Sequence, residues 1–383
     1  MQQRTRDEHL FEPGPKRILA LDGGGIRGAL TLGYLKRIED ILRERVNGDP
    51  DFRLCDYFDL IGGTSTGSII AAGLALGFSV EKLQKMYQSL ATEVFKKPLL
   101  RLGVFSSKFP KEPLIQALTE NFGDNTLGSD QLRTGLMVMT KRLDTGSPWM
   151  MHNNPKGKYF DPHSGSGVPN KDYLVREIVR ASTAAPHYFE PEDMEVAPGV
   201  NGAFVDGGVS PYNNPALQLL MLATLKGYGL EWPMGADNLL LVSVGTGFLE
   251  TRMEPKEVMD MPAIQLAAQS VISIMGDCDW LGQTVLQWLS NSATPWKIDS
   301  EVGNLQQDVI GSGSSLLTYL RYTLAYDSGW LRDNLNIEMS EKEATSLFAM
   351  DNPQNVQTLS ELGTKAAAVQ ISANHFPRGF DLN

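Results

Sequence analysis

The stretch from Asp56 to Gly77 constrains the fold more than any other, because it predicts a strand, a tight turn and a helix in direct succession. The apolar residues at 57–61 are typical of a buried strand, and the small residues at 68–76 are typical of a closely packed helix. Between them, Gly63-Thr-Ser-Thr-Gly67 fits the G-x-S-x-G pattern. In that pattern a strained backbone exposes the central hydroxyl, and side chains in place of the glycines would clash with neighbouring elements. We therefore predict that Ser65 is a nucleophile rather than part of an ordinary polar turn.

A second glycine-rich turn precedes this one along the chain. Arg17 to Leu21 predicts a first strand, which runs into Asp22-Gly-Gly-Gly-Ile-Arg-Gly28. A helix follows up to about Arg45, because its apolar residues recur at helical spacing. Together with the serine turn, the order strand, helix, strand, helix predicts a right-handed start to a largely parallel sheet.

The glycine-rich turn allows two interpretations. Gly23 to Gly28 matches the G-x-G-x-x-G pattern of dinucleotide-binding folds, but those folds place an acidic residue at the end of the second strand, where this chain has Gly62 and Gly63. The interpretation we favour is an oxyanion hole, since consecutive glycines let main-chain N–H groups converge on one point. Arg27 beside the turn either binds a phosphate, whose geometry its guanidinium matches, or forms a surface salt bridge.

A serine nucleophile needs a base that takes its proton. Asp206 follows the short apolar strand at 203–205 and precedes Gly207 and Gly208, so it is either a turn residue or a base at a strand end, where open α/β sheets hold their chemistry. The histidines are the other candidates. Ser65, Asp206 and His375 occur in the chain order of an α/β-hydrolase triad, which keeps a triad open. The remaining histidines are His9, His152, His163 and His187.

Charge and cysteine content exclude several classes of partner. A net charge of −11 argues against binding to nucleic-acid polymers and against electrostatic adhesion to anionic membranes. Cys55 and Cys278 have no metal-ligand neighbours at useful spacing, so we expect two reduced thiols, a cytoplasmic protein, and neither a metal ion nor a cofactor. No apolar run approaches the roughly 18 residues of a membrane span, so we expect any lipid contact to be peripheral.

The character of the sequence changes after residue 250. We predict long helices over 261–291 and 313–326, a third helix opened by a capping box at Ser340, and a fourth that begins at Asn352. No strand is predicted after Val244. The predicted organisation has three parts: a flexible leader (1–16), a catalytic domain (17–250), and a helical C-terminal extension packed on the same domain (251–383).

Three motifs, taken together and in order, resemble those of the patatin-like phospholipases. They are Asp22-Gly-Gly-Gly-Ile-Arg-Gly28, Gly63-Thr-Ser-Thr-Gly67 and Asp206-Gly-Gly208. Secondary matches are Ala181-Ser-Thr-Ala-Ala-Pro186, Asn213-Asn-Pro215 and Ser243-Val-Gly-Thr-Gly247. The resemblance covers about residues 17–250. It implies a three-layer α/β/α sandwich with a mainly parallel central sheet, to which this chain adds C-terminal helices.

The resemblance also implies a mechanism without histidine. Ser65 would be the nucleophile and Asp206 the base of a Ser–Asp dyad. Gly24 and Gly25 would supply the N–H groups of the oxyanion hole, and Arg27 would lie near the lipid phosphate. The implied activity is that of a phospholipase A type of serine acyl hydrolase, which cleaves fatty-acyl esters of membrane phospholipids.

Three alternatives stay open. One is a non-lipid serine esterase with a Ser-Asp-His triad, and another is a non-catalytic lipid- or nucleotide-binding module. The third is regulatory, because some bacterial members of the family are switched on by a cyclic nucleotide as membrane-damaging antiphage effectors. A cyclic-nucleotide activator is therefore an alternative partner for this chain.

Two segments bear on how such an enzyme would reach lipid. Residues 96–109 mix basic and apolar side chains, and they either dip into a membrane interface or pack on the core. The helix expected over 263–289 is apolar around much of its circumference. Burial is the default for such a helix, with a lid or a self-association face of a homo-oligomer as alternatives.

Overall fold

The computed structural model describes residues 3–94, 109–162, 167–249, 253–308, 310 and 314–382. Within these residues the centre of the molecule is a nine-stranded mixed sheet with the order β5-β6-β3-β2-β1-β7-β9-β8, and β4 pairs with β3 off this path. The strands are β1 (Lys16–Leu21), β2 (Leu60–Thr64), β3 (Gly135–Arg142), β4 (Ser147–His152), β5 (Glu192–Ala197), β6 (Val200–Asp206), β7 (Leu239–Val244), β8 (Ser290–Asn291) and β9 (Leu317–Tyr322).

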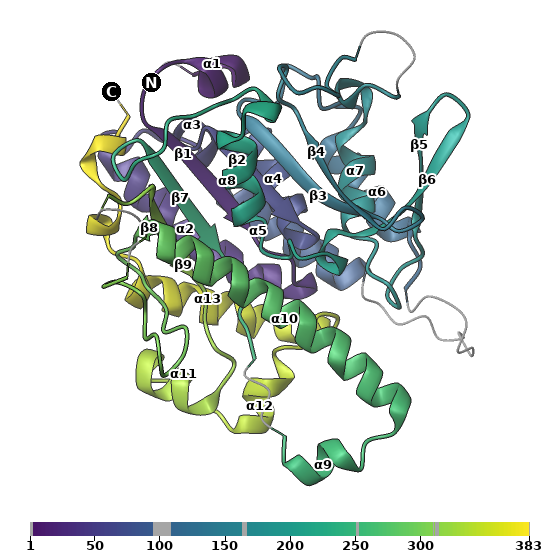
Figure 1. Cartoon of the computed structure of the whole chain (residues 1–383), viewed down its shortest axis with the longest axis vertical. Coiled ribbons are helices and arrows are strands. Elements are labelled where there is room, and N and C mark those ends of the chain that lie inside the picture. Colours follow the sequence, from purple (N-terminus) through teal and green to yellow (C-terminus); the bar gives the residue numbers. More distant parts are fainter. Residues whose placement is uncertain are drawn as a thin grey trace.

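Helices cover both faces of this sheet, which gives the predicted three-layer α/β/α sandwich (Figure 1). The helices are α1 (Arg6–Phe11), α2 (Gly28–Arg45), α3 (Leu54–Tyr57), α4 (Thr66–Ala75), α5 (Val80–Val94), α6 (Glu112–Phe122), α7 (Val175–Ser182), α8 (Ala216–Thr224), α9 (Pro255–Met259), α10 (Ala263–Leu289), α11 (Ser328–Leu335), α12 (Glu341–Ser346) and α13 (Val356–Gln370).

Strand β1 is the middle of the sheet, and its side chains divide the core into two. It pairs in parallel with β2 on one side and with β7 on the other. Leu19 and Leu21 pack with α2, α4 and α13 on one face, whereas Ile18 and Ala20 pack with α8 and the end of α10 on the other. All six residues of β1 are buried, as expected for a parallel strand covered on both faces.

The prediction that no strand follows Val244 is wrong. Residues 317–322 lie within the segment expected as a helix over 313–326, but they form β9, which pairs in parallel with β7. The short β8 extends the sheet beyond it. The strand Leu-Thr-Tyr-Leu-Arg-Tyr is covered on both faces, so it lacks the alternation of polar and apolar residues that identifies a half-buried strand. The C-terminal region therefore contributes to the central sheet as well as to the helical layers.

Part of the expected flexible leader forms helix α1. Thr5 and Glu8 make a reciprocal capping box at its start, and His9 and Leu10 are buried. His9 Nδ1 lies 2.9 Å from Asp59 Oδ1, which joins the helix to the chain just before β2. The signal was present in the sequence as Thr-x-x-Glu before an apolar pair, a pattern that starts helices.

The serine turn is displaced from the predicted strand boundary. Residues 54–57 form the short helix α3, and the strand expected at 57–61 is instead β2, which runs through two glycines to Thr64. Glycine is uncommon inside strands, so the predicted strand ended before Gly62 and Gly63.

No helix among the described residues is long and apolar enough to cross a membrane.

Candidate active site

Ser65 stands at the junction of β2 and α4, in a backbone conformation that few non-glycine residues adopt. Its φ is 52° and its ψ is −125°. A Cβ atom on Gly63 would overlap the Gly67 carbonyl group, and one on Gly67 would overlap the Leu21 carbonyl oxygen. Both glycines are therefore required by close backbone packing, and the turn that they permit lifts the serine hydroxyl away from the sheet.

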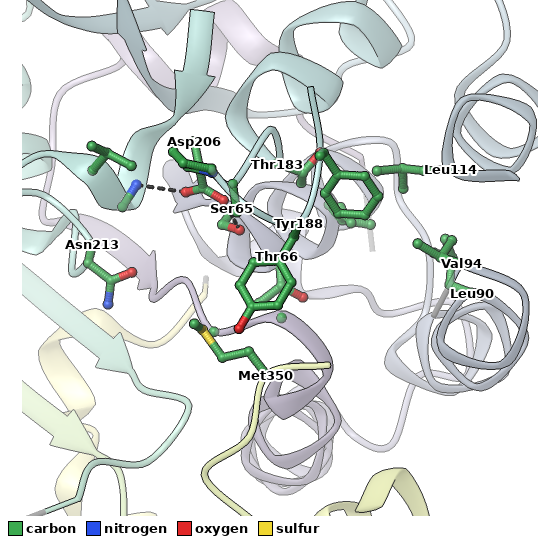
Figure 2. A pocket seen from close by; sticks show the side chains of 18 of the residues that line it. Ser65, Thr66, Leu90, Val94, Leu114, Thr183, Tyr188, Asp206, Asn213 and Met350 are labelled. Atoms are coloured by element: carbon green, nitrogen blue, oxygen red, sulfur yellow. Dashed lines mark hydrogen bonds between the residues drawn. The ribbon is translucent and has the colours of Figure 1, made fainter. Parts of the chain in front are cut away.

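The Ser65 hydroxyl donates a hydrogen bond to the Asp206 carboxylate. The distance from Ser65 Oγ to Asp206 Oδ2 is 2.6 Å, and Figure 2 shows the two side chains facing each other. The second carboxylate oxygen, Oδ1, accepts a hydrogen bond of 2.7 Å from the Gly208 backbone N–H. The carboxylate is therefore fixed at both oxygens, with one of them directed at the serine.

Asp206 reaches Ser65 by a route that differs from the one its sequence suggested. Strand β3 pairs with β2 in parallel up to Met139 and then continues for three residues beyond it. Strand β6 pairs with this extension in the antiparallel direction, with Asp206 opposite Thr140. The carboxylate thus lies at the end of an antiparallel strand that approaches the edge of the parallel sheet from outside.

Burial raises the pKa of the Asp206 carboxyl. Only 4% of the residue is exposed, and this desolvation raises the pKa of its carboxyl to about 6. The hydrogen bonds from Ser65 and Gly208 and the charge of the buried Arg180 oppose the shift. The carboxyl is therefore ionised at neutral pH but is a stronger base than an exposed aspartate, which suits a group that must accept a serine proton.

The glycine-rich turn lies beside the serine. Gly24 and Gly25 both line the same pocket as Ser65, and Gly25 has a φ of 59°. A Cβ atom on Gly24 would overlap Thr246, and one on Gly25 would overlap the Met350 carbonyl oxygen. Within the part of the chain that the structure describes, neither glycine N–H has a hydrogen-bond acceptor. Two unpaired donors next to a serine hydroxyl are what an oxyanion hole requires.

Arg27 has other partners than the predicted phosphate. It is 6% exposed, and its Nε and Nη1 atoms each donate a 3.2 Å hydrogen bond, to the carbonyl groups of Gly24 and Gly247 respectively. Its guanidinium carbon lies 4.1 Å from the centroid of the Phe348 ring. These contacts support the glycine-rich turn from beneath, and Arg27 does not line the pocket. The phosphate contact stays a prediction.

The histidine of the alternative triad lies elsewhere. His375 Nδ1 is 3.1 Å from the Tyr322 hydroxyl, and the two rings stack. His9 pairs with Asp59, and His152 is buried, where desolvation lowers its pKa to about 4. His163 lies outside the described residues. No histidine is among the described residues that line the pocket, so the Ser65-Asp206 pair stands there without an imidazole.

The pocket that opens at Ser65 has a volume of about 380 Å³ and a mainly apolar wall. Ile69, Leu90, Val94, Leu114 and Phe189 contribute to this wall. Figure 2 shows Leu90, Val94 and Leu114 together at the end of the cavity away from Asp206, with Tyr188 and Met350 nearer the serine. Such a cavity can take up a hydrocarbon chain while its ester group lies at the hydroxyl.

The sequence identified Ser182 only as part of a motif, without a role. Its hydroxyl accepts a 2.9 Å hydrogen bond from the Ser65 backbone N–H and donates one of 2.7 Å to the Met139 carbonyl group. Ser182 thereby ties the strained serine turn to β3. Its position in the Ala181 to Pro186 motif was the signal that could have indicated this role.

Two acidic residues outside the predicted site hold its loops. Asp22 begins the glycine-rich turn and forms two hydrogen bonds with Arg321 of β9, at 2.9 and 2.5 Å. Asp279 of α10 accepts hydrogen bonds from the Asn213 side chain at 3.1 Å and the Asn214 N–H at 3.2 Å. Arg321 and Asp279 both come from the C-terminal region, where no motif was recognised. No group of three or more potential metal ligands occurs among the described residues.

The fold and site together define a class of protein, an α/β acyl hydrolase with an apolar cavity at its serine turn. Residues 19–220 match the family model described as patatin-like phospholipase, which is more than half of the chain, and the chain belongs to this family. This similarity confirms the predicted activity, that of a lipid acyl hydrolase.

Several relatives share this similarity. The cGAMP-activated phospholipase of Vibrio cholerae serotype O1 is 32% identical over 253 residues, which cover 63% of this chain and 67% of that protein. The cGAMP-activated phospholipase of Escherichia coli (strain TW11681) is 29% identical over 370 residues, 95% of this chain and 92% of that protein. Patatin-15 of Solanum tuberosum is 29% identical over 247 residues, 60% of each chain.

Proposed function

We propose that Ser65 and Asp206 form a catalytic dyad that hydrolyses fatty-acyl esters of membrane phospholipids. The observation that carries this proposal is the 2.6 Å hydrogen bond from Ser65 Oγ to a buried carboxylate at the edge of an apolar cavity. The cavity holds the acyl chain, and the ester carbonyl lies between the serine hydroxyl and the N–H groups of Gly24 and Gly25.

The reaction proceeds in two halves. In the first, Asp206 takes the Ser65 proton as Oγ attacks the ester carbonyl carbon, and the oxyanion is stabilised by the Gly24 and Gly25 N–H groups. The bond to the lysolipid oxygen then breaks, and Asp206 returns the proton to that oxygen. In the second half, Asp206 takes a proton from water, the hydroxide attacks the acyl-enzyme, and the fatty acid leaves as Ser65 regains its proton.

The test is the release of fatty acid from mixed phospholipid vesicles by the wild type and by Ser65→Ala. We expect release by the wild type and only background release by the variant, because a methyl group cannot form the acyl-enzyme. Fluorophosphonate labelling provides a check that does not depend on the substrate, since only an activated Ser65 reacts. Equal release by both proteins, or labelling of the Ser65→Ala variant, would contradict the proposal.

The pH dependence should report the ionisation of Asp206. Because burial raises its pKa to about 6, the base is protonated below that pH and ionised above it. We expect kcat/KM for a soluble fatty-acyl ester to fall about tenfold for each pH unit below about 6 and to be level near neutrality. Asp279 also has a pKa raised by burial to about 6, so Asp279→Asn is the control. The fall in kcat/KM below about pH 6 should persist in that variant. If the fall disappears there, the ionising group is Asp279 rather than Asp206.

We propose further that a cyclic dinucleotide activates the enzyme, and that the enzyme is cytoplasmic and acts at the membrane surface. The support is that the Escherichia coli relative, matched along 95% of this chain, is named a cGAMP-activated phospholipase, and that a third relative, also from Escherichia coli, is named cUMP-AMP-activated. Fatty-acid release should rise when cGAMP or cUMP-AMP is added to the wild type with vesicles. Full release without either nucleotide, and no increase when they are added, would contradict activation and indicate a constitutive phospholipase.

A further inference from the structure

Helix α10 is exposed where its composition predicts burial. The 14 residues from 263 to 276 contain no charged side chain. Ile264 is 82% exposed, Ile272 55% and Ile274 59%, and Met259 in the preceding helix α9 is 86% exposed. Figure 1 shows this half of α10, together with α9, extending away from the sheet and its helices. Burial, the default expectation for α10, therefore does not hold for these side chains of its N-terminal half.

Such a surface needs a partner that covers it. Apolar side chains that stand singly on a protein surface are ordinary, but several exposed ones on neighbouring turns of one helix mark a contact with another protein or with lipid. The stretch is about 21 Å long, from 14 residues at the rise of an α-helix. Its exposed polar side chains, such as Gln265 and Ser273, are uncharged, so charge attraction to a partner contributes nothing here.

The same helix continues directly into the active site. Met275, one residue after the exposed Ile274, lines the pocket that contains Ser65. Four residues later Asp279 binds Asn213 and Asn214, and Asn213 also lines the pocket. The exposed apolar surface and the apolar cavity are thus adjacent along one helix, and the helix is anchored at the catalytic loop.

We propose that residues 263–276 of α10 lie in the interfacial layer of a lipid bilayer and bring the opening of the pocket to the membrane surface. This inference rests on the proposed function in one respect, that the substrate is a lipid drawn from a bilayer. An apolar helix beside the opening gives the acyl chain a continuous path from bilayer to cavity. A second copy of the chain seated on the same residues would lie beside the opening that the substrate must use.

The absence of charge from this stretch specifies the kind of surface. Interfacial helices that depend on anionic lipids carry lysine or arginine on their polar face, and salt weakens their binding. Residues 263–276 have neither, so the contact is apolar and suits zwitterionic lipid. The basic and apolar segment 96–109, the other candidate for lipid contact, lies outside the described residues except for Phe109.

The experiment is flotation with phosphatidylcholine vesicles, using the full chain with Ser65→Ala so that no lipid is consumed. Ile272→Asp/Ile274→Asp should lower the bound fraction about tenfold or more, because two carboxylates would have to enter the interface. Ile272→Gln/Ile274→Gln should lower it less. Val369→Asp, which changes a side chain 64% exposed on α13, is the matched control and should bind as the parent does. All four proteins should keep the same unfolding midpoint, since these side chains are exposed.

Three outcomes would overturn the inference. One is vesicle binding by the aspartate variant equal to that of the parent, and another is binding that requires anionic lipid and is lost in high salt. The third is a parent that does not bind vesicles but forms a dimer that the aspartate variant lacks, which would assign α10 to a second copy. Because binding is measured without catalysis, its failure is distinct from a failure of the Ser65-Asp206 proposal, which fluorophosphonate labelling tests.

Discussion

Replacing Asp206 with asparagine is expected to lower kcat/KM for a fatty-acyl ester by about 10²–10⁴-fold, the usual contribution of a positioned general base. Asparagine has nearly the same shape and can still accept the hydrogen bond from the Gly208 N–H, so the turn should keep its structure. It cannot take a proton from Ser65, however, and the serine hydroxyl then remains a poor nucleophile. Initial rates with a soluble ester, together with the unfolding midpoint, measure the two effects separately.

His375→Ala is the control for this prediction, because His375 is the base of the alternative triad. Its ring contacts Tyr322 rather than the serine, so we expect kcat/KM to be unchanged. A large loss in His375→Ala with near-normal activity in Asp206→Asn would contradict the dyad. Large losses in both variants would instead favour a conformation in which a Ser-Asp-His triad assembles, because such a triad needs its aspartate as well as its histidine.

The second large effect is expected for Arg321→Met. Arg321 and Asp22 are 10% and 5% exposed at their side chains, and they share two hydrogen bonds. Burial disfavours the charge on Arg321, but the Asp22 carboxylate raises the pKa of the guanidinium above its usual value. Removing the arginine leaves a buried carboxylate without its cation, and breaking such a pair costs about 3–5 kcal/mol in the free energy of unfolding. Urea unfolding at pH 7 measures this loss.

Two comparisons distinguish this effect from a general sensitivity to lost charge. Arg332→Met removes an arginine that is 55% exposed and pairs with Asp333, which is 66% exposed, so the stability of the protein should hardly change. The double variant Asp22→Asn/Arg321→Met should recover part of the loss, because no buried charge is left unpaired. A single Arg321→Met variant as stable as the wild type would show that Asp22 is not held by this pair.

Much of the site could be predicted because its signals are local in the sequence. A serine between glycines after a strand, and three glycines after another strand, specify backbone geometry within a few residues. Asp206 was expected directly after a strand, and β6 does end at this residue, 2.6 Å from the Ser65 hydroxyl. Its antiparallel approach was not predicted, because the direction of β6 depends on its pairing with the extension of β3, and pairing is not encoded in a short pattern.

The C-terminal region was harder to predict for a physical reason. Strand β9 is buried on both faces, so it carries no alternating pattern, and apolar runs of this kind suit a helix equally well. Nothing in the sequence around Arg321 indicates a partner for it. In the structure β9 brings it to Asp22, which is 299 positions away in the chain. The reverse occurred at α10, whose apolar composition made burial the default, although Ile264, Ile272 and Ile274 in its N-terminal half are each more than half exposed.

The pocket is lined partly by Met350, a residue outside the region that matches the family model. Its carbonyl oxygen accepts a 2.9 Å hydrogen bond from the Ile26 N–H, directly after the glycines, and Met350 itself lines the cavity. It lies 130 positions beyond residue 220, where the family match ends. Two enzymes with identical catalytic motifs can therefore differ in the shape of this cavity beside the serine through the chain after α12 alone. Preference among ester substrates is a property that exchanges of this C-terminal segment would change, with the catalytic motifs left untouched.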